Sequence, residues 1–165
     1  MKLNLCRDAE ASGSLGEDST GHVWWLETLE KTHFLGEQLA RALPQNAILL
    51  MQGPLGAGKT SLVQGMARAC GINEPITSPT FALAQHYLQG QPPLVHLDLY
   101  RLESIAAADE LFLQEEEEAR AIGALMAVEW PERLGIDLPE AWRLELSHHG
   151  DSRQAQLTPP RNRTT

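Results

Sequence analysis

A glycine-rich segment at residues 53–60, GPLGAGKT, matches the pattern G-x-x-x-x-G-K-[ST]. Glycines in such a loop let several backbone N–H groups point into one concavity that holds phosphate oxygens, at the positive end of the following helix. Lys59 adds a positive charge toward the β and γ phosphates, and Thr60 offers a hydroxyl to Mg²⁺. We therefore predict that this loop binds the phosphates of a nucleotide together with Mg²⁺.

Two acidic residues follow apolar runs elsewhere in the chain. Asp98 comes directly after residues 94–97, the usual placement of the carboxylate that assists the metal in P-loop enzymes. Glu129 comes directly after residues 125–128. In a parallel sheet both acids would emerge at the same edge as the phosphate-binding loop, where ligands bind. We predict that both are metal-site and catalytic carboxylates.

A short polar segment, TSPT at residues 77–80, lies between the phosphate-binding loop and Asp98. Many P-loop proteins keep a segment that senses the γ-phosphate at this place, although the residues alone indicate only a turn. The six histidines show no metal-ligand spacing, and we interpret them as surface or strand residues.

The elements that must position these residues are indicated by the hydrophobic pattern. Residues 47–51 form a short apolar run that suits a strand buried on both faces, and it leads into the loop. Apolar residues at helical spacing follow the loop, and Gly71 stands where a helix commonly ends. The predicted order of strand, loop and helix is the one that a phosphate-binding loop needs.

The rest of the chain alternates predicted helices with predicted strands. We expect an amphipathic helix over residues 26–43 with Thr28 as its N-cap, an acidic helix over 105–121, a buried strand over 124–128, and hairpins over 80–97 and 141–157. This alternation places the domain in the α/β class.

The length of 165 residues and the hydrophobic content of 42% suit one domain, which we place at residues 23–158. Residues 1–22 and 159–165 are polar, and we expect disordered tails there. No run of 18 apolar residues and no signal-peptide pattern occurs, so we expect a cytoplasmic protein without a membrane anchor. Cys6 and Cys70 are far apart, and we expect both to be reduced thiols.

The formal net charge of −9 limits the partners that the chain can bind unaided. A domain that binds RNA or DNA by itself usually carries a basic face or stripe. An acidic domain repels the phosphate backbone, so any nucleic-acid role would run through a partner protein.

Four motifs together resemble the bacterial TsaE family, the ATPase of tRNA threonylcarbamoyladenosine synthesis. They are GPLGAGKT at residues 53–60, TSPTF at 77–81, HLDLYRL at 96–102 and VEWP at 128–131. Their order and spacing match across about residues 26–157. The loop alone is shared by many families, whereas the combination is much narrower.

The resemblance implies a P-loop NTPase fold, a three-layer sandwich with a mostly parallel central sheet and antiparallel hairpin strands. It also implies ATP and Mg²⁺ as ligands. It implies that the chain acts beside the TsaB and TsaD proteins in modifying the adenosine 3′ of the anticodon, and that it meets tRNA only through those partners. The ATP-binding residues that we expect from the motifs and the resemblance are Thr28, Leu55, Gly56, Ala57, Gly58, Lys59, Thr60, Ser61, Thr80, Trp130 and Arg153. Thr60, Asp98 and Glu129 are the expected metal-site residues, and Lys59, Asp98 and Glu129 are the expected catalytic residues.

Two other functions fit a P-loop in a chain of this size. A small-molecule kinase usually carries an arginine-rich lid, yet Arg101 and Arg120 are the only basic residues between Asp98 and Glu129. A slow, nucleotide-binding regulatory module would use the same residues as an ATPase, so the sequence does not separate the two. A GTPase is not favoured, because none of the three lysines lies in the N/T-K-x-D setting that reads guanine.

Overall fold

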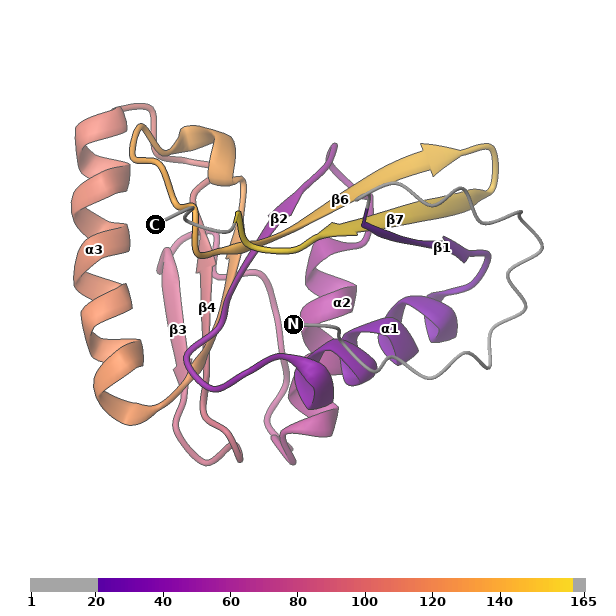
Figure 1. Cartoon of the computed structure of the whole chain (residues 1–165), viewed down its shortest axis with the longest axis horizontal. Coiled ribbons are helices and arrows are strands. Elements are labelled where there is room, and N and C mark those ends of the chain that lie inside the picture. The colour runs from indigo at the N-terminus through magenta and orange to yellow at the C-terminus, as the bar shows by residue number, and fades with distance from the viewer. Residues whose placement is uncertain (1–20, 162–165) are drawn as a thin grey trace.

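Seven strands form one mixed sheet in the computed structural model, which describes residues 21–161 (Figure 1). The elements follow in the order β1 (His22–Leu26), α1 (Leu29–Ala42), β2 (Ile48–Gln52), α2 (Lys59–Ala69), β3 (Ala84–Tyr87), β4 (Leu94–Asp98), α3 (Ile105–Ile122), β5 (Leu125–Glu129), the 3-10 turn η1 (Pro131–Arg133), β6 (Trp142–His149) and β7 (Ser152–Thr158). The strand order across the sheet is β1-β7-β6-β2-β5-β4-β3.

The centre of the sheet is parallel and its edges are antiparallel. Strand β2 pairs in parallel with β5 and β6, and β4 pairs in parallel with β5. The β3/β4, β6/β7 and β1/β7 pairs are antiparallel. The predicted α/β fold with a mostly parallel centre and hairpin strands is therefore confirmed.

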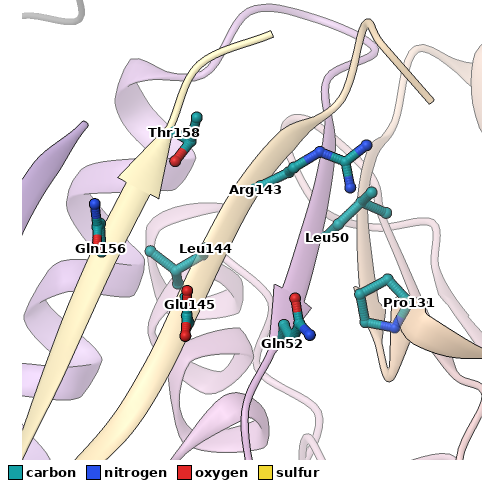
Figure 2. A pocket seen from close by; sticks show the side chains of 8 residues that line it. All are labelled: Leu50, Gln52, Pro131, Arg143, Leu144, Glu145, Gln156 and Thr158. Atoms are coloured by element: carbon teal, nitrogen blue, oxygen red, sulfur yellow. The ribbon is translucent and has the colours of Figure 1, made fainter. Parts of the chain in front are cut away.

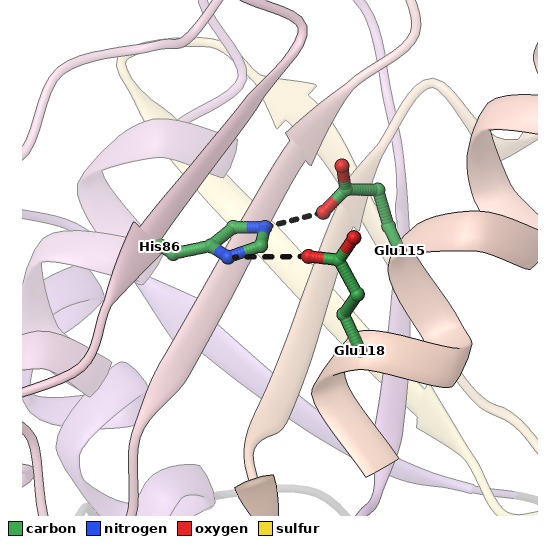
Figure 3. Close-up of side chains that lie close together, drawn as sticks. All are labelled: His86, Glu115 and Glu118. Atoms are coloured by element: carbon green, nitrogen blue, oxygen red, sulfur yellow. Dashed lines mark hydrogen bonds and ion pairs between the residues drawn. The ribbon is translucent and has the colours of Figure 1, made fainter. Parts of the chain in front are cut away.

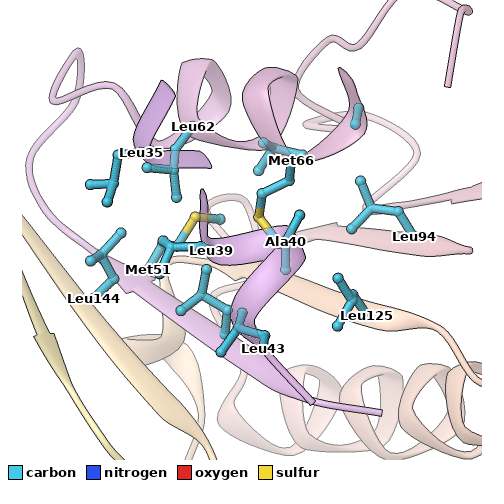
Figure 4. Packing of buried hydrophobic residues seen from close by; sticks show 14 of the residues in the cluster. Leu35, Leu39, Ala40, Leu43, Met51, Leu62, Met66, Leu94, Leu125 and Leu144 are labelled. Carbon is cyan, nitrogen blue, oxygen red and sulfur yellow. The ribbon is translucent and has the colours of Figure 1, made fainter. Parts of the chain in front are cut away.

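Two hydrophobic cores lie on opposite faces of the sheet. Helices α1 and α2 cover one face, where their side chains pack on Met51 and Leu144, and α3 covers the other face over β4 and β5 (Figures 1 and 4). Successive residues of β2 belong to alternate cores. Leu49 and Met51 are part of the first core, and Ile48 and Leu50 are part of the second. A strand buried on both faces reads as a continuous apolar run, which is why the sequence predicted β2.

Helices α1 and α2 approach each other through glycines. A Cβ atom added at Gly36 would lie 2.1 Å from the carbonyl oxygen of Leu62, and one at Gly65 would lie 2.0 Å from that of His33. Both distances are shorter than van der Waals contact, so any side chain at these two positions would separate the helices. The close approach brings the start of α1 beside the phosphate-binding loop, and Thr32 lines the same cavity as the loop.

The N-terminal boundary of the domain differs from the expected pattern. We expected the helix to begin at Leu26, whereas residues His22–Leu26 form the edge strand β1 and the helix begins at Leu29. The N-cap prediction is confirmed, because the Thr28 hydroxyl accepts a hydrogen bond from the Lys31 backbone N–H at 3.2 Å. Strand β1 begins one residue before the boundary expected at residue 23.

The ends of the chain lie only partly within the described residues. The expected disordered tails fall mostly on residues 1–20 and 162–165, and Cys6 also lies outside the described part. Arg161 is fixed, because its backbone N–H donates to the Pro139 carbonyl at 2.8 Å and its side chain pairs with Asp137. Within residues 21–161, no helix has the length and apolar character that crossing a membrane requires.

Helix α3 is fastened to the edge strand β3 by a histidine and two glutamates (Figure 3). Glu115 is buried in the apolar stripe of α3 and contacts His86 Nε2, while a Glu118 carboxylate oxygen lies 3.8 Å from His86 Nδ1. The two carboxylates thus approach opposite nitrogens of one ring. We interpret the group as a polar contact between helix α3 and strand β3.

Candidate nucleotide-binding site

The loop between β2 and α2 has the backbone geometry of a phosphate cradle. Gly58 is the N-cap of α2 and adopts a φ of 104°, in the left-handed region that other residues rarely enter. At position 53, a Cβ atom would lie 2.4 Å from the Leu146 carbonyl oxygen, so only glycine fits there. The first backbone N–H groups of α2 have no partner within their helix and carry its positive partial charge. The loop can therefore hold an anion.

Lys59 occupies the first position of α2 with only 5% of its surface exposed. Its Nζ donates hydrogen bonds to the carbonyl oxygens of Gly53 and, at 3.1 Å, of Pro54. The ammonium also lies 4.1 Å from the centre of the Trp130 ring. Burial lowers the pKa of Lys59, and the nearby carboxylates of Glu129, Glu132 and Asp98 oppose that effect. Lys59 is thus a poorly solvated cation held beside the phosphate cradle.

Thr60, in the first turn of α2, contacts Glu129, the last residue of β5. The Thr60 hydroxyl donates to Glu129 Oε1 at 2.8 Å, and Glu129 is only 3% exposed. The hydroxyl uses its proton in that bond, so its oxygen lone pairs are left for a cation. Hydroxyl and carboxylate oxygens are the ligands that Mg²⁺ prefers, and the pair therefore fits a magnesium site.

Asp98 holds the TSPT segment against the sheet. Its Oδ2 accepts hydrogen bonds from the hydroxyls of Ser78 and, at 3.1 Å, Thr80. Its Oδ1 accepts from the backbone N–H of Tyr100 at 2.9 Å. Asp98 is the register partner of Glu129 on the neighbouring strand. Its two carboxylate oxygens, however, bond to Ser78, Thr80 and the Tyr100 backbone. Its carboxylate thereby positions two of the three hydroxyl groups of the TSPT segment, those of Ser78 and Thr80.

Trp130 follows Glu129 in a conformation that is unusual for a tryptophan. Its φ is 60°, in the left-handed region, which typically costs about 1–3 kcal/mol. The conformation turns its ring toward Lys59 and Tyr100, whose ring centre lies 4.8 Å from that of Trp130. Such strain is found where a side chain must be placed for function.

These groups line one cavity of about 380 Å³. Every expected nucleotide-site residue except Thr28 lines it, together with Asp98 and Glu129. Thr28 instead caps helix α1. Arg153 reaches the cavity from β7, and its Nε and Nη2 donate to the Gly56 carbonyl oxygen at 3.3 and 3.1 Å.

Four further lining residues were not among the expected site residues: Leu29, Thr32, Ser78 and Tyr100. Ser78 and Tyr100 belong to the TSPT and HLDLYRL motifs, so their place in those motifs is a signal that could have found them. Leu29 and Thr32 carry no such signal, because they depend on how α1 packs beside the loop.

A second hollow, over β2, β6, β7 and η1, lacks this chemistry (Figure 2). It measures about 170 Å³, and its lining includes Gln52, Arg143, Glu145 and Gln156. It offers neither a glycine-rich backbone nor a helix N-terminus to an anion. The loop cavity, which offers both, is the candidate site.

Comparison with known proteins finds relatives along most of the chain. Residues 26–156 match the family model of the threonylcarbamoyl adenosine biosynthesis protein TsaE. The chain is 48% identical over 114 residues to a Synechocystis protein named tRNA threonylcarbamoyladenosine biosynthesis protein TsaE, covering 67% of this chain and 71% of the relative. It is 43% identical over 140 residues to the Nostoc protein of that name, covering 82% and 84%.

A more distant relative and a solved structure agree with these matches. The Mycobacterium tuberculosis protein named TsaE is 38% identical over 142 residues, covering 79% of this chain and 82% of the relative. The crystal structure of Bacillus subtilis YdiB superposes with a TM-score of 0.68 at 25% identity, over 90% of this chain and 91% of that one.

Proposed function

Because the chain belongs to the TsaE family of threonylcarbamoyl adenosine biosynthesis proteins, we propose that it is a Mg²⁺-dependent ATPase required for this tRNA modification. The observation that carries the proposal is the convergence of Lys59, Thr60 and Glu129 in one cavity beside the phosphate cradle. A cation, a metal-binding hydroxyl and a buried carboxylate are the groups that phosphoryl transfer needs.

Lys59 supplies the positive charge that meets the β and γ phosphates. Its ammonium donates to two loop carbonyl groups, of Gly53 and Pro54, and phosphate oxygens would take their place as acceptors. The low exposure of Lys59 strengthens this interaction, because little water competes for the charge.

Thr60, Glu129 and Asp98 form the metal side of the proposed site. When bound, Mg²⁺ neutralises charge that develops on the phosphates. The Thr60 hydroxyl and the Glu129 carboxylate would hold the ion, with the Thr60 hydroxyl oriented by its hydrogen bond to Glu129. Asp98 fixes the Ser78 and Thr80 hydroxyls at the wall of the cavity, where they would meet the γ-phosphate. Lys59, Asp98 and Glu129 are thus the proposed catalytic residues.

We propose that hydrolysis by the isolated chain is slow and that TsaB and TsaD accelerate it. A missing arginine finger can cost about 10³ to 10⁵ in rate in P-loop enzymes. Arg153 is the arginine that lines the cavity, but it is bound to the Gly56 carbonyl oxygen. A partner that draws Arg153 toward the phosphates, or adds its own cation, would supply the missing charge.

The acidic face of α3 is a second feature that suits a partner. Glu110, Glu117 and Glu118 are exposed on this helix, and the chain carries a net charge of −9. Such a face would meet a basic surface of the partner complex, and salt would weaken the association. The same negative charge would repel tRNA, so this chain would meet tRNA only through its partners. We also propose a cytoplasmic location for the assembly.

The environment of Arg101 and Arg120, the basic residues between Asp98 and Glu129, supports an ATPase over a small-molecule kinase. Arg101 stacks on the ring of Phe81, with 4.2 Å between its guanidinium carbon and the ring centre. Arg120 pairs with Glu116 on the surface of α3. Neither lines the cavity, where a kinase lid would bring its arginines to the phosphates.

The test is steady-state ATP hydrolysis by the chain alone and with the TsaB–TsaD heterodimer, at low and high salt. We expect slow turnover alone, acceleration by the heterodimer, and less acceleration at high salt. Lys59→Ala serves as the inactive control in each arm. Equal turnover with and without the heterodimer would contradict the partner role, and parental turnover by Lys59→Ala would contradict the site.

A further inference from the structure

His96 contacts the site residue Glu129 but does not line the cavity where a nucleotide would bind. It belongs to β4, two residues before Asp98, and its exposure is 0%. Its Nε2 lies 2.8 Å from Glu129 Oε1, the same oxygen that accepts the Thr60 hydroxyl. Its Nδ1 is buried and has no hydrogen-bond partner among residues 21–161.

The contact with Glu129 favours one tautomer of the His96 ring. A carboxylate oxygen accepts hydrogen bonds, so the geometry assigns the donated proton to Nε2. In that tautomer Nδ1 is an acceptor in the protein interior. An unsatisfied buried polar atom typically costs about 1–3 kcal/mol. An apolar side chain at this position would avoid that cost, as Leu94 does earlier on the same strand.

We infer that His96 is a positioning residue, which fixes Glu129 Oε1 so that the Thr60 hydroxyl donates to it and turns its own oxygen toward Mg²⁺. This inference rests on the proposed function. Glu129 Oε1 receives two donors from two directions, one from α2 and one from β4. Two such bonds fix a carboxylate better than one, and fixed outer groups raise the metal affinity of the groups that they hold.

Two amide variants test the inference with closely matched side chains. In His96→Gln the amide nitrogen can reach the place of Nε2 and donate to Glu129, whereas in His96→Asn it reaches only the place of Nδ1. Both variants keep a polar, uncharged side chain at the buried position. They therefore differ mainly in whether Glu129 Oε1 keeps its second donor.

The readout is the Mg²⁺ dependence of ADP binding, measured by calorimetry over a series of Mg²⁺ concentrations and once in EDTA. Loss of an outer-shell partner typically lowers metal affinity about 10- to 100-fold. We expect His96→Asn to raise the Mg²⁺ concentration for half-maximal enhancement of ADP binding at least about tenfold. His96→Gln should remain within about threefold of the parent, and neither variant should change binding in EDTA.

The outcomes separate the inference from the proposed function. Equal Mg²⁺ dependence of the two amide variants would overturn the positioning role, as would equal weakening of ADP binding in EDTA. Parental ADP binding that ignores Mg²⁺ altogether would instead contradict the magnesium site. Should His96→Asn fail to fold, His96→Leu replaces it, because leucine also lacks a donor for Glu129 Oε1 and the inference predicts the same rise in the Mg²⁺ concentration.

Discussion

Replacing Asp98 with asparagine tests how the site holds its TSPT segment. Asp98 is 3% exposed and accepts hydrogen bonds from Ser78, Thr80 and the Tyr100 backbone N–H. A bond to a charged acceptor contributes about 1.5–3 kcal/mol, and a bond between neutral groups about 0.5–1.5 kcal/mol. An asparagine amide can replace these bonds only with neutral ones, its oxygen accepting from Tyr100 N–H and its nitrogen donating to the two hydroxyls, so the change removes on the order of 3–4 kcal/mol.

Part of that loss is offset in the variant. Asp98 and Glu129 are register partners on neighbouring strands, so removing one buried negative charge relieves their repulsion. We therefore expect Asp98→Asn to lower the free energy of unfolding by about 2 kcal/mol in urea denaturation. Hydrogen exchange at residues 77–83 should also become faster, because the segment loses its main attachment.

Asp109→Asn is the matched control for this substitution. Asp109 accepts hydrogen bonds from the backbone N–H groups of Gly135 and Ile136, at 2.9 and 3.4 Å, in a more exposed place. Its loss should lower the free energy of unfolding by less than about 1 kcal/mol. If Asp98→Asn proves as stable as Asp109→Asn and leaves exchange at residues 77–83 unchanged, Asp98 does not hold the segment.

Three further predictions follow from the described contacts. Gly65→Ala should destabilise the protein by about 1–3 kcal/mol in urea denaturation, because its methyl group would press on the His33 carbonyl; unchanged stability would contradict the close helix contact. Nucleotide binding should take up protons at alkaline pH, because burial lowers the pKa of Lys59 in the free protein and phosphate would raise it. Affinity should then fall as the pH rises through the free-protein pKa, and calorimetry in buffers of different ionisation enthalpy checks this. The Cys70 thiol, whose pKa is raised by burial, should resist alkylation in the folded protein and react in urea, and rapid alkylation without denaturant would contradict its burial.

The local elements were predictable because their signals are local. The apolar run of β2, the glycines of the loop and the helical spacing of α2 follow one another directly in the sequence. The two hairpins were predictable for the same reason, since turn residues separate their strands. Strand β1 was missed because its partner is β7, at the other end of the chain, with Trp24 opposite Ala155. The apolar pattern that continues from Leu26 into α1 favoured a longer helix instead.

The partners of the site residues could not be predicted from the sequence. Thr60, Asp98 and Glu129 line one cavity, and their place at the metal stays a prediction, but the sequence did not predict that the Thr60 hydroxyl bonds to Glu129 while Asp98 bonds to Ser78 and Thr80. This division follows from the strand order, in which β5 lies between β2 and β4. The sequence offers no local signal for that order, and the same holds for the contact between His96 and Glu129.

The most direct test of the proposed site is calorimetric titration of ATP into the parent and Lys59→Ala, with Mg²⁺ and with EDTA. Loss of a charge-assisted hydrogen bond of about 1.5–3 kcal/mol corresponds to about 10- to 150-fold in affinity. We predict that the parent binds Mg²⁺-ATP more tightly than ATP in EDTA, and that Lys59→Ala is weaker by at least about tenfold while it keeps a folded circular dichroism spectrum. Equal ATP affinity of the two proteins, with no effect of Mg²⁺, would contradict the assignment of the nucleotide site to this cavity.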